Sequence, residues 1–218
     1  MHFLANWFVK ITGVIPYLIL MWPKIFYEDR KVQGRRIKGK AIVISNHNSV
    51  MDVAVMMFTF PGRTLRCVTA ELMFKKNFVM SFFLHAIGAI RVDRDAHDFA
   101  FLEKSKRILS RGGVVEIYPE ARLPRAGEER PLPFKPSAVY MALESGAPII
   151  PVYHSRRGFV DRDSAVLIGK PIDVRELFDD TLDEKQNIEI ITEIVRGKII
   201  ELGKELERKK EEEKRDRI

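Results

Sequence analysis

The feature that most constrains the fold of this chain is a regular alternation of short apolar runs and longer helical stretches after residue 40. The runs expected to form strands are Ala41–Ser45, Thr64–Thr69, Ile87–Val92, Val114–Tyr118, Pro148–Tyr153 and Ala165–Ile168. The stretches with helical spacing are Val50–Phe60, Glu71–Leu84, Ala96–Ser110 and Pro136–Ser145. This alternation predicts an α/β fold with a mostly parallel central sheet flanked by helices. Chemistry is then expected in the loops at the carboxyl ends of the strands.

The last segment, Asp183–Ile218, has the pattern of one long amphipathic helix. Its apolar positions recur at helical spacing, and the chain becomes almost wholly charged after Glu207. The apolar face extends over too few heptads for a coiled coil, so packing on the sheet is the favoured prediction.

The first 30 residues form a separate segment in this interpretation, and residues 31–218 form one catalytic domain. Met1–Phe26 is rich in aromatic and aliphatic residues, but Lys10 interrupts it and the uncharged run Ile11–Pro23 is short for a membrane span, which needs about 20 residues. Six Lys and Arg residues follow between positions 30 and 40 without an acid. We therefore expect a helical segment that lies on a bilayer, at the cytoplasmic face of the cell membrane, as a peripheral or monotopic attachment. The alternative is a first helix buried in the core, followed by a solvated basic loop.

Charge and cysteine content narrow the partners and the compartment. The 218 residues contain 37 Lys and Arg against 30 Asp and Glu, a net charge of +7, which favours an anionic partner such as phosphate, nucleic acid or an acidic membrane. The single cysteine, Cys67, excludes a disulfide within the chain and fits a reducing compartment. We expect Cys67 to be a buried structural thiol rather than a nucleophile.

The residues most suggestive of chemistry follow the first predicted strand, in Asn46-His47-Asn48-Ser49-Val50-Met51-Asp52. On one continuous helix, positions five apart point in different directions, so His47 and Asp52 meet only if His47 precedes the helix and Asp52 lies in its first turn. Asn48 or Ser49 is expected to cap that helix. Asp52 then accepts the Nδ1 proton of His47 and leaves Nε2 to act as a general base on an alcohol. A structural hydrogen-bonded pair is the alternative.

Cationic residues follow other predicted strands. Arg94 comes just after Ile87–Val92, and Arg122 follows Val114–Tyr118 together with Glu120. Paired N–H donors of Arg bind phosphate well, and Lys135, beside a predicted helix start, adds a point charge. A phosphate-bearing substrate next to His47 is therefore predicted.

With these segments in view, the chain resembles the glycerolipid acyltransferase family, specifically the 1-acylglycerol-3-phosphate O-acyltransferases. Four blocks occur in the family's order, over roughly residues 40 to 155: Asn46-His47 with Asp52, Gly88 to Arg94, Tyr118-Pro119-Glu120, and Ala147-Pro148-Ile149-Ile150-Pro151-Val152. The resemblance implies a glycerol-3-phosphate acyltransferase-like fold and transfer of a fatty acyl group from a thioester to the hydroxyl of lysophosphatidic acid or a related lysophospholipid, giving phosphatidic acid.

The resemblance also implies roles for residues. His47 is the base, Asp52 orients it, and Arg94, Glu120 and Arg122 form the acceptor site, with Lys135 and Ser49 as further substrate-binding candidates. It implies acyl-CoA or acyl-carrier protein as donor, no cofactor and no metal.

Two departures from the family's pattern concern the acceptor site. Where the family has Phe-Pro-Glu-Gly, this chain has Tyr118-Pro119-Glu120-Ala121, and its arginine follows two residues after the glutamate instead of three. The Phe-Lys-x-Gly element ends in Ser137. These changes alter the residues expected to form the acceptor pocket.

Two other functions remain open. A catalytically idle lipid-binding relative would keep the basic pocket without turnover. A nucleic-acid-binding protein would explain the charge, but the sequence has no recognisable nucleic-acid-binding motif and its basic run lies beside an apolar segment. The sequence also has no glycine-rich nucleotide loop and no paired His or Cys spacing typical of a metal site. His2, His85, His97 and His154 are expected to be structural or solvated.

Overall fold

The structure, a computed structural model, describes residues 2–20, 23–93, 100–155, 161 and 163–216. A seven-stranded sheet forms its centre, in the order β1-β7-β6-β2-β5-β3-β4. The strands are β1 (Lys24–Tyr27), β2 (Ala41–Ser45), β3 (Leu65–Ala70), β4 (Ile90–Val92), β5 (Val114–Ile117), β6 (Ile149–His154) and β7 (Ala165–Ile168). Every pairing is parallel except that of β6 with β7. The predicted α/β fold with a mostly parallel sheet is confirmed.

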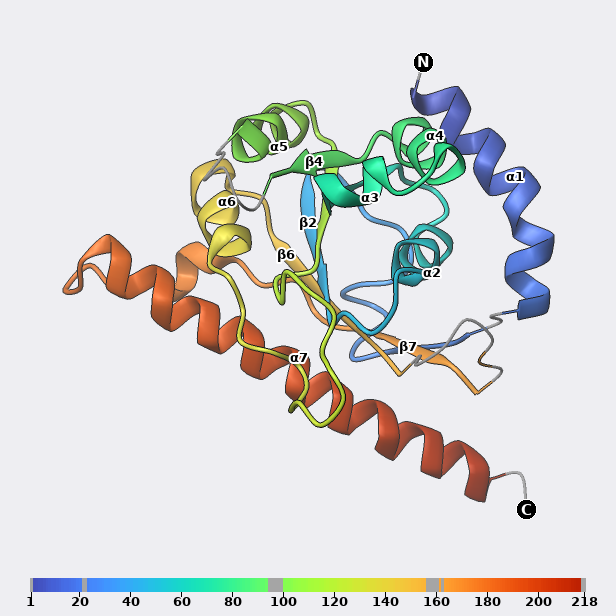
Figure 1. Ribbon diagram of the computed structural model, residues 1–218. Coiled ribbons are helices and arrows are strands. Elements are labelled where there is room, and N and C mark those ends of the chain that lie inside the picture. Colours follow the sequence, from blue (N-terminus) through green and yellow to red (C-terminus); the bar gives the residue numbers. More distant parts are fainter. Residues whose placement is uncertain (1, 21–22, 94–99, 156–160, 162, 217–218) are drawn as a thin grey trace.

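Helices cover both faces of the sheet (Figure 1). They are α1 (His2–Leu20), α2 (Asp52–Thr59), α3 (Glu71–Lys75), α4 (Phe78–Ile87), α5 (Ala100–Ser110), α6 (Ser137–Ser145) and α7 (Glu184–Arg215), with a 3₁₀ turn, η1 (Val174–Leu177). Side chains alternate along each strand, so β2 directs Val43 into one buried cluster with α1, α2 and α4, and Ile42 and Ile44 into the other with α5, α6 and α7. The site described below lies on the side of α2, α3 and α4.

The predicted long helix over Glu71–Leu84 is wrong in one respect, because the structure divides it into α3 and α4. Asn77 is extended, with φ −163° and ψ 166°, and its side chain accepts a hydrogen bond from the backbone N–H of Met80. An asparagine that caps a new helix interrupts the old one, even where the flanking residues are apolar. The strand predicted from Ile87 begins later, at Ile90, because Gly88 ends α4 in the left-handed conformation, with φ 70°.

The N-terminal segment includes a strand that sequence reasoning missed. β1 pairs in parallel with β7, with Lys24 opposite Ala165 and Tyr27 opposite Ile168. The strand has only four residues and follows the apolar N-terminal segment directly, so the sequence contains no separate signal for it. Residues 24–27 are therefore part of the central sheet.

Helix α1 has one packed side and one exposed side. Tyr17 stacks on Phe58 of α2 with ring centroids 4.2 Å apart, and the buried Lys10 ammonium donates to the carbonyl oxygens of Pro61 at 2.8 Å and Arg63 at 2.6 Å. Desolvation by burial lowers the pKa of Lys10 to about 8. Among the described residues, no helix is both long enough and apolar enough to cross a membrane.

Helix α7 confirms the prediction for the C-terminal segment. Asp183 and Gln186 form a capping box at its start. Its buried residues include Ile191, Val195 and Ile199, and it packs on β6 and β7 rather than on another long helix.

Candidate active site

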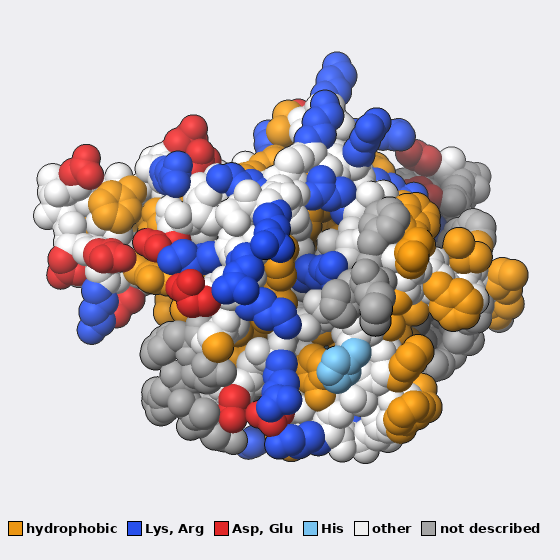
Figure 2. Space-filling model, turned by 90° about the horizontal axis from the view of Figure 1, so that it is seen from above, with side chains coloured by type: hydrophobic (Ala, Val, Ile, Leu, Met, Phe, Trp, Pro, Cys, Tyr) orange, Lys and Arg blue, Asp and Glu red, His pale blue; other side chains and the backbone are white. Residues whose placement is uncertain are grey.

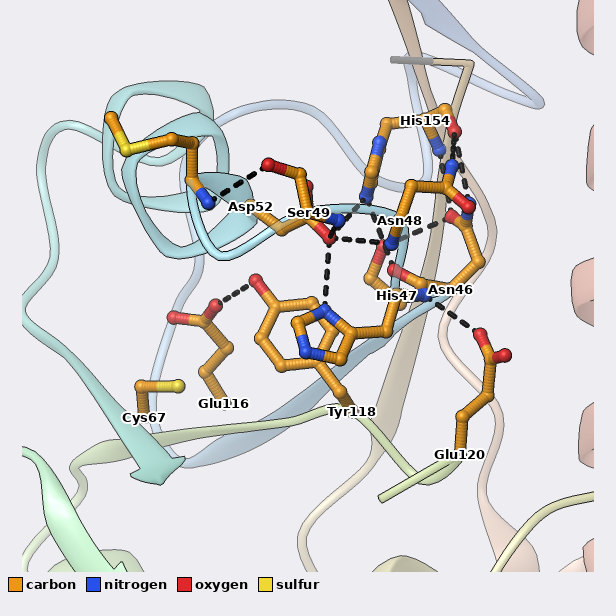
Figure 3. Close-up of polar contacts among 12 residues, drawn as sticks. Asn46, His47, Asn48, Ser49, Asp52, Cys67, Glu116, Tyr118, Glu120 and His154 are labelled. Atoms are coloured by element: carbon orange, nitrogen blue, oxygen red, sulfur yellow. Dashed lines mark hydrogen bonds and ion pairs between the residues drawn. The ribbon is translucent and has the colours of Figure 1, made fainter. Parts of the chain in front are cut away.

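The site forms where β2 ends and the chain turns into α2. His47 follows the strand, and Asp52 is the first residue of α2, so the two side chains meet as the spacing predicted: His47 Nδ1 lies 2.9 Å from Asp52 Oδ2 (Figure 3). The Asp52 side chain is fully buried, whereas 17% of the His47 side chain is exposed. Among the described residues, His47 Nε2 has no hydrogen-bond partner. This nitrogen is therefore free to take a proton from a substrate.

The Asp52 carboxylate organises the whole turn. Its Oδ2 also accepts the backbone N–H groups of Asn48 at 2.7 Å and Ser49 at 2.9 Å. Burial opposes ionisation of Asp52, but contacts with His154 and His47 and the N–H of Ser49 hold its pKa well below the usual range. An ionised Asp52 fixes the Nδ1–H tautomer of His47, which is the tautomer a general base at Nε2 requires.

The predicted helix cap is not the one observed. Met51 is the N-cap residue of α2 and makes no side-chain capping bond. The Ser49 hydroxyl instead accepts the N–H of Met51 at 3.2 Å. The expectation that Asn48 or Ser49 caps α2 is therefore wrong, because Asp52 itself occupies the free N–H groups of this turn.

Sequence reasoning did not connect His154 with the site. His154 ends β6, only 1% exposed, and its Nε2 lies 3.1 Å from the carbonyl oxygen of Asn46 and 3.5 Å from Asp52 Oδ2. The backbone N–H of His154 donates to Asn46 Oδ1 at 3.0 Å, and the backbone carbonyl oxygen of His154 accepts from Asn46 Nδ2 at 2.9 Å. This contact joins the neighbouring strands β2 and β6. Two residues 108 positions apart give no local pattern, so only the order of the strands could have revealed it.

Glu120 supports His47 from the other side. Its Oε1 accepts the backbone N–H of His47 at 2.7 Å, and its Oε2 accepts that of Leu132 at 2.8 Å. Burial raises the pKa of Glu120, and these two hydrogen bonds act against that rise. The structure therefore places Glu120 behind the His47 backbone, where it connects the loops after β2 and β5.

The predicted cationic residues are only partly brought together. Arg122 is exposed and borders the pocket described below, but its guanidinium forms a two-pronged ion pair with Glu128 at 2.7 and 2.8 Å. Lys135 is exposed and precedes α6, while its N–H donates to Pro119. Arg94 lies outside the described residues. Arg130, which the sequence did not single out, donates to the Asn48 side chain at 3.4 Å.

An apolar pocket of about 700 Å³ opens beside His47. Its walls come from α2, β3, α3, α4 and the segment after β5. The lining residues include His47, Val53, Cys67, Met80, Tyr118 and Leu123. Cys67 is buried, as predicted, and its desolvation, followed by the proximity of Glu116, raises the pKa of the thiol. Such a pocket fits a hydrocarbon chain whose reacting end lies at the imidazole.

A second, polar hollow of about 420 Å³ lies on the Asn46 and Asn48 side of the same loop and includes Arg130 and Lys210. His47 therefore stands between an apolar pocket and polar surface. Among the described residues, no cluster of three or more His, Cys, Asp or Glu side chains could hold a metal ion.

The residue following Glu120 has an unusual backbone. Ala121 has a φ of 60°, in the left-handed region that favours glycine. A glycine, which the glycerolipid acyltransferases have at this place, would adopt this conformation without strain.

Comparison with known proteins agrees with the geometry. The family model described as "Acyltransferase" matches residues 25–155. The chain is 28% identical to human 1-acyl-sn-glycerol-3-phosphate acyltransferase beta over 129 residues, covering 59% of this chain and 45% of the relative. It is 31% identical to the 1-acyl-sn-glycerol-3-phosphate acyltransferase of Limnanthes alba over 163 residues, covering 64% and 57%. The chain thus spans about half the length of these curated relatives.

A solved structure shares the fold. The crystal structure of the 1-acyl-sn-glycerophosphate (LPA) acyltransferase PlsC from Thermotoga maritima superposes with a TM-score of 0.62 at 19% identity, covering 91% of this chain and 79% of that one.

Proposed function

Because the chain belongs to the acyltransferase family, whose model matches residues 25–155, we propose that it transfers a fatty acyl group from a thioester to the free hydroxyl of lysophosphatidic acid or a related lysophospholipid. The product is phosphatidic acid or its analogue. The observation that carries this proposal is the Asp52-bound imidazole of His47 at the end of an apolar pocket of about 700 Å³.

In this mechanism the substrate supplies its own nucleophile. His47 Nε2 removes the proton of the acceptor hydroxyl as that oxygen attacks the thioester carbonyl carbon. The tetrahedral intermediate collapses, the C–S bond breaks, and the imidazolium returns the proton to the leaving sulfur. Asp52 stabilises the imidazolium throughout, since it stays ionised.

The substrate's parts fit different surfaces. A fatty acyl chain fits the apolar pocket next to α2, and coenzyme A or acyl-carrier protein would carry it there. The acceptor phosphate requires cations, and Arg122 and Arg130 are exposed on the segment after β5. Arg122 would exchange Glu128 for phosphate, with Arg94, Lys135 and Ser49 as further predicted contacts.

The proposal includes attachment to a membrane surface at its cytoplasmic face. Exposed apolar side chains gather over α1 and α4 at one side of the molecule (Figure 2). They include Leu4, Phe8, Ile11, Ile15 and Ile19 of α1, Leu72 of α3, and Phe78, Val79 and Phe82 of α4. Leu72 and Val79 also line the apolar pocket, so a chain entering it would come from this face. The basic residues between positions 30 and 40 favour anionic lipid.

The test of the reaction is turnover of labelled acyl-CoA and lysophosphatidic acid by purified protein in detergent, with the product identified by mass. His47→Gln should reduce the rate by at least about a thousandfold. His85→Gln is the matched control, because His85 lies on α4 outside the pocket lining and should leave the rate unchanged. A folded His47→Gln protein with near-native turnover would refute the proposed base.

The membrane proposal is tested separately, by sedimentation with vesicles containing anionic lipid. Phe8→Ser combined with Phe82→Ser should weaken the binding. Stronger binding to oligonucleotides than to vesicles would favour a nucleic-acid-binding protein.

A further inference from the structure

A fully buried carboxyl group lies beneath the site and takes no part in the proposed reaction. Glu116, on β5, is 1% exposed. Its Oε1 accepts a hydrogen bond from the Tyr118 hydroxyl at 2.5 Å, and its Oε2 has no partner among the described residues. The two residues are two apart along the chain, so they point to the same side of the sheet (Figure 3).

Tyr118 touches the proposed base directly. Its ring stacks on the His47 imidazole, with centroids 4.5 Å apart and planes at 25°. Asp52 forms a hydrogen bond at the edge of the imidazole, and Tyr118 stacks against its face. Two such contacts restrict rotation of the imidazole more than the carboxylate alone could, so the direction of Nε2 depends on where the Tyr118 ring lies.

The hydroxyl of Tyr118 has a specific partner here. The resembling family has phenylalanine at this place, which needs no partner, whereas the Tyr118 side chain is buried with a polar end. A buried hydroxyl without a hydrogen bond is costly. Glu116 supplies that hydrogen bond and so fixes the far end of the ring that supports His47.

The surroundings of Glu116 favour its neutral form. Its described neighbours are Cys67, opposite it on β3, Tyr118, just after the end of its own strand, and Asp52 on α2. Desolvation by burial is the main cause that raises the pKa of Glu116 to about 8; the Tyr118 hydrogen bond lowers it, and the charge of Asp52 adds to the rise. At neutral pH, Glu116 therefore adds no second negative charge near Asp52.

We propose that Glu116 is a positioning residue for acyl transfer: by accepting the Tyr118 hydroxyl it fixes the ring that stacks on His47, and so fixes the direction of Nε2. The neutral carboxyl does this without a charge in the buried site, and its ionisation would disturb the arrangement. The inference rests on the proposed function for its activity assays. Ionisation would place a charge in a buried site that contains no described cation, and the site would have to rearrange to solvate it.

The first experiment separates kcat from KM in three variants. Glu116→Leu leaves the Tyr118 hydroxyl unpaired and should lower kcat about tenfold, with KM within about twofold of wild type. Glu116→Gln keeps an acceptor for that hydroxyl and should retain kcat at pH 7. The double variant Glu116→Leu with Tyr118→Phe removes both polar groups and should recover most of the loss, because pairs of polar groups replaced together are nearly neutral. A double variant no better than Glu116→Leu would overturn the proposed contact.

The second experiment is the pH profile of kcat, corrected for alkaline thioester hydrolysis without enzyme. Wild type should lose activity as pH rises, with a midpoint near 8, and Glu116→Gln should lack this loss. The same alkaline loss in both proteins would overturn the inference. If Glu116→Leu fails to fold by circular dichroism, the comparison with Glu116→Gln still decides.

A readout without turnover distinguishes failure of this inference from failure of the proposed function. The ¹³C NMR signals of the His47 ring, assigned with His47→Gln, should show an inflection near pH 8 in wild type that is absent in Glu116→Gln. If the His47 signals show the inflection near pH 8 but the protein transfers no acyl group, the proposed reaction is refuted and the role of Glu116 is not. Its absence in wild type would refute the role of Glu116, whatever the reaction.

Discussion

Replacing Asp52 by asparagine is the most informative single change at this site. The substitution keeps the size of the side chain and an oxygen that can accept the N–H groups of Asn48 and Ser49. It removes the negative charge that lies 2.9 Å from His47 Nδ1. The variant therefore isolates the electrostatic part of the role proposed for Asp52, which is to stabilise the imidazolium that would form at His47 during transfer.

The size of the effect follows from this distance. At 2.9 Å and an effective dielectric constant of about 20, Coulomb's law gives about 6 kcal/mol between carboxylate and imidazolium. The amide oxygen still accepts the Nδ1 proton, which recovers about 1 to 2 kcal/mol, and part of the imidazole contacts solvent. A net loss of about 4 kcal/mol corresponds to a decrease in kcat on the order of a thousandfold.

The assay is single-turnover acyl transfer at saturating substrates, with folding monitored by thermal unfolding. Asp183→Asn is the matched control, since Asp183 caps α7 and asparagine caps helices equally well. Turnover by a folded Asp52→Asn protein within tenfold of wild type would show that the carboxylate does not support the base.

Three further predictions concern the neighbouring segments. Ala121→Gly should raise the free energy of unfolding by up to about 1 kcal/mol in urea denaturation, because Ala121 adopts a φ of 60°; a decrease would contradict the strain. Glu128→Gln should lower KM for lysophosphatidic acid about twofold to fivefold in steady-state assays, because Arg122 is then free for phosphate; an unchanged KM would argue against Arg122 as a phosphate ligand. The wild-type free energy of unfolding should fall as pH rises from 4.5 to 8, and Glu116 should contribute at most about 5 kcal/mol of this fall. In this pH window the folded protein keeps the Glu116 proton, whereas the unfolded chain has released it. Calorimetry should find a smaller fall in Glu116→Gln, and an equal fall would contradict the burial argument.

The parts of the molecule that depend on local pattern could be predicted. β2 and β7 have the expected bounds. The contact of His47 with Asp52 could be predicted because β2 ends at Ser45, before His47, and α2 begins at Asp52. Periodicity and turn residues are local, so one sequence is enough to interpret them.

The missed features depend on contacts between distant segments. The hydrogen bonds of His154 to Asn46 require β6 to lie next to β2, and Glu120 reaches the His47 backbone only because β5 lies on the other side of β2. Arg122 was predicted to bind phosphate because it follows a strand end. Its ion pair with Glu128 could not be predicted, because it depends on the course of the loop after β5. The break at Asn77 was a local signal that the surrounding apolar residues obscured.

The place of β1 at the sheet edge has a consequence for engineering. Shortening the chain by its first 30 residues, to remove the proposed lipid-binding helix, would also strip β7 of its parallel neighbour. The uncovered β7 backbone would then present unpaired N–H and C=O groups, which promote self-association. Serine substitutions at the exposed apolar positions of α1 are the better way to test the proposed attachment, because they leave the sheet complete.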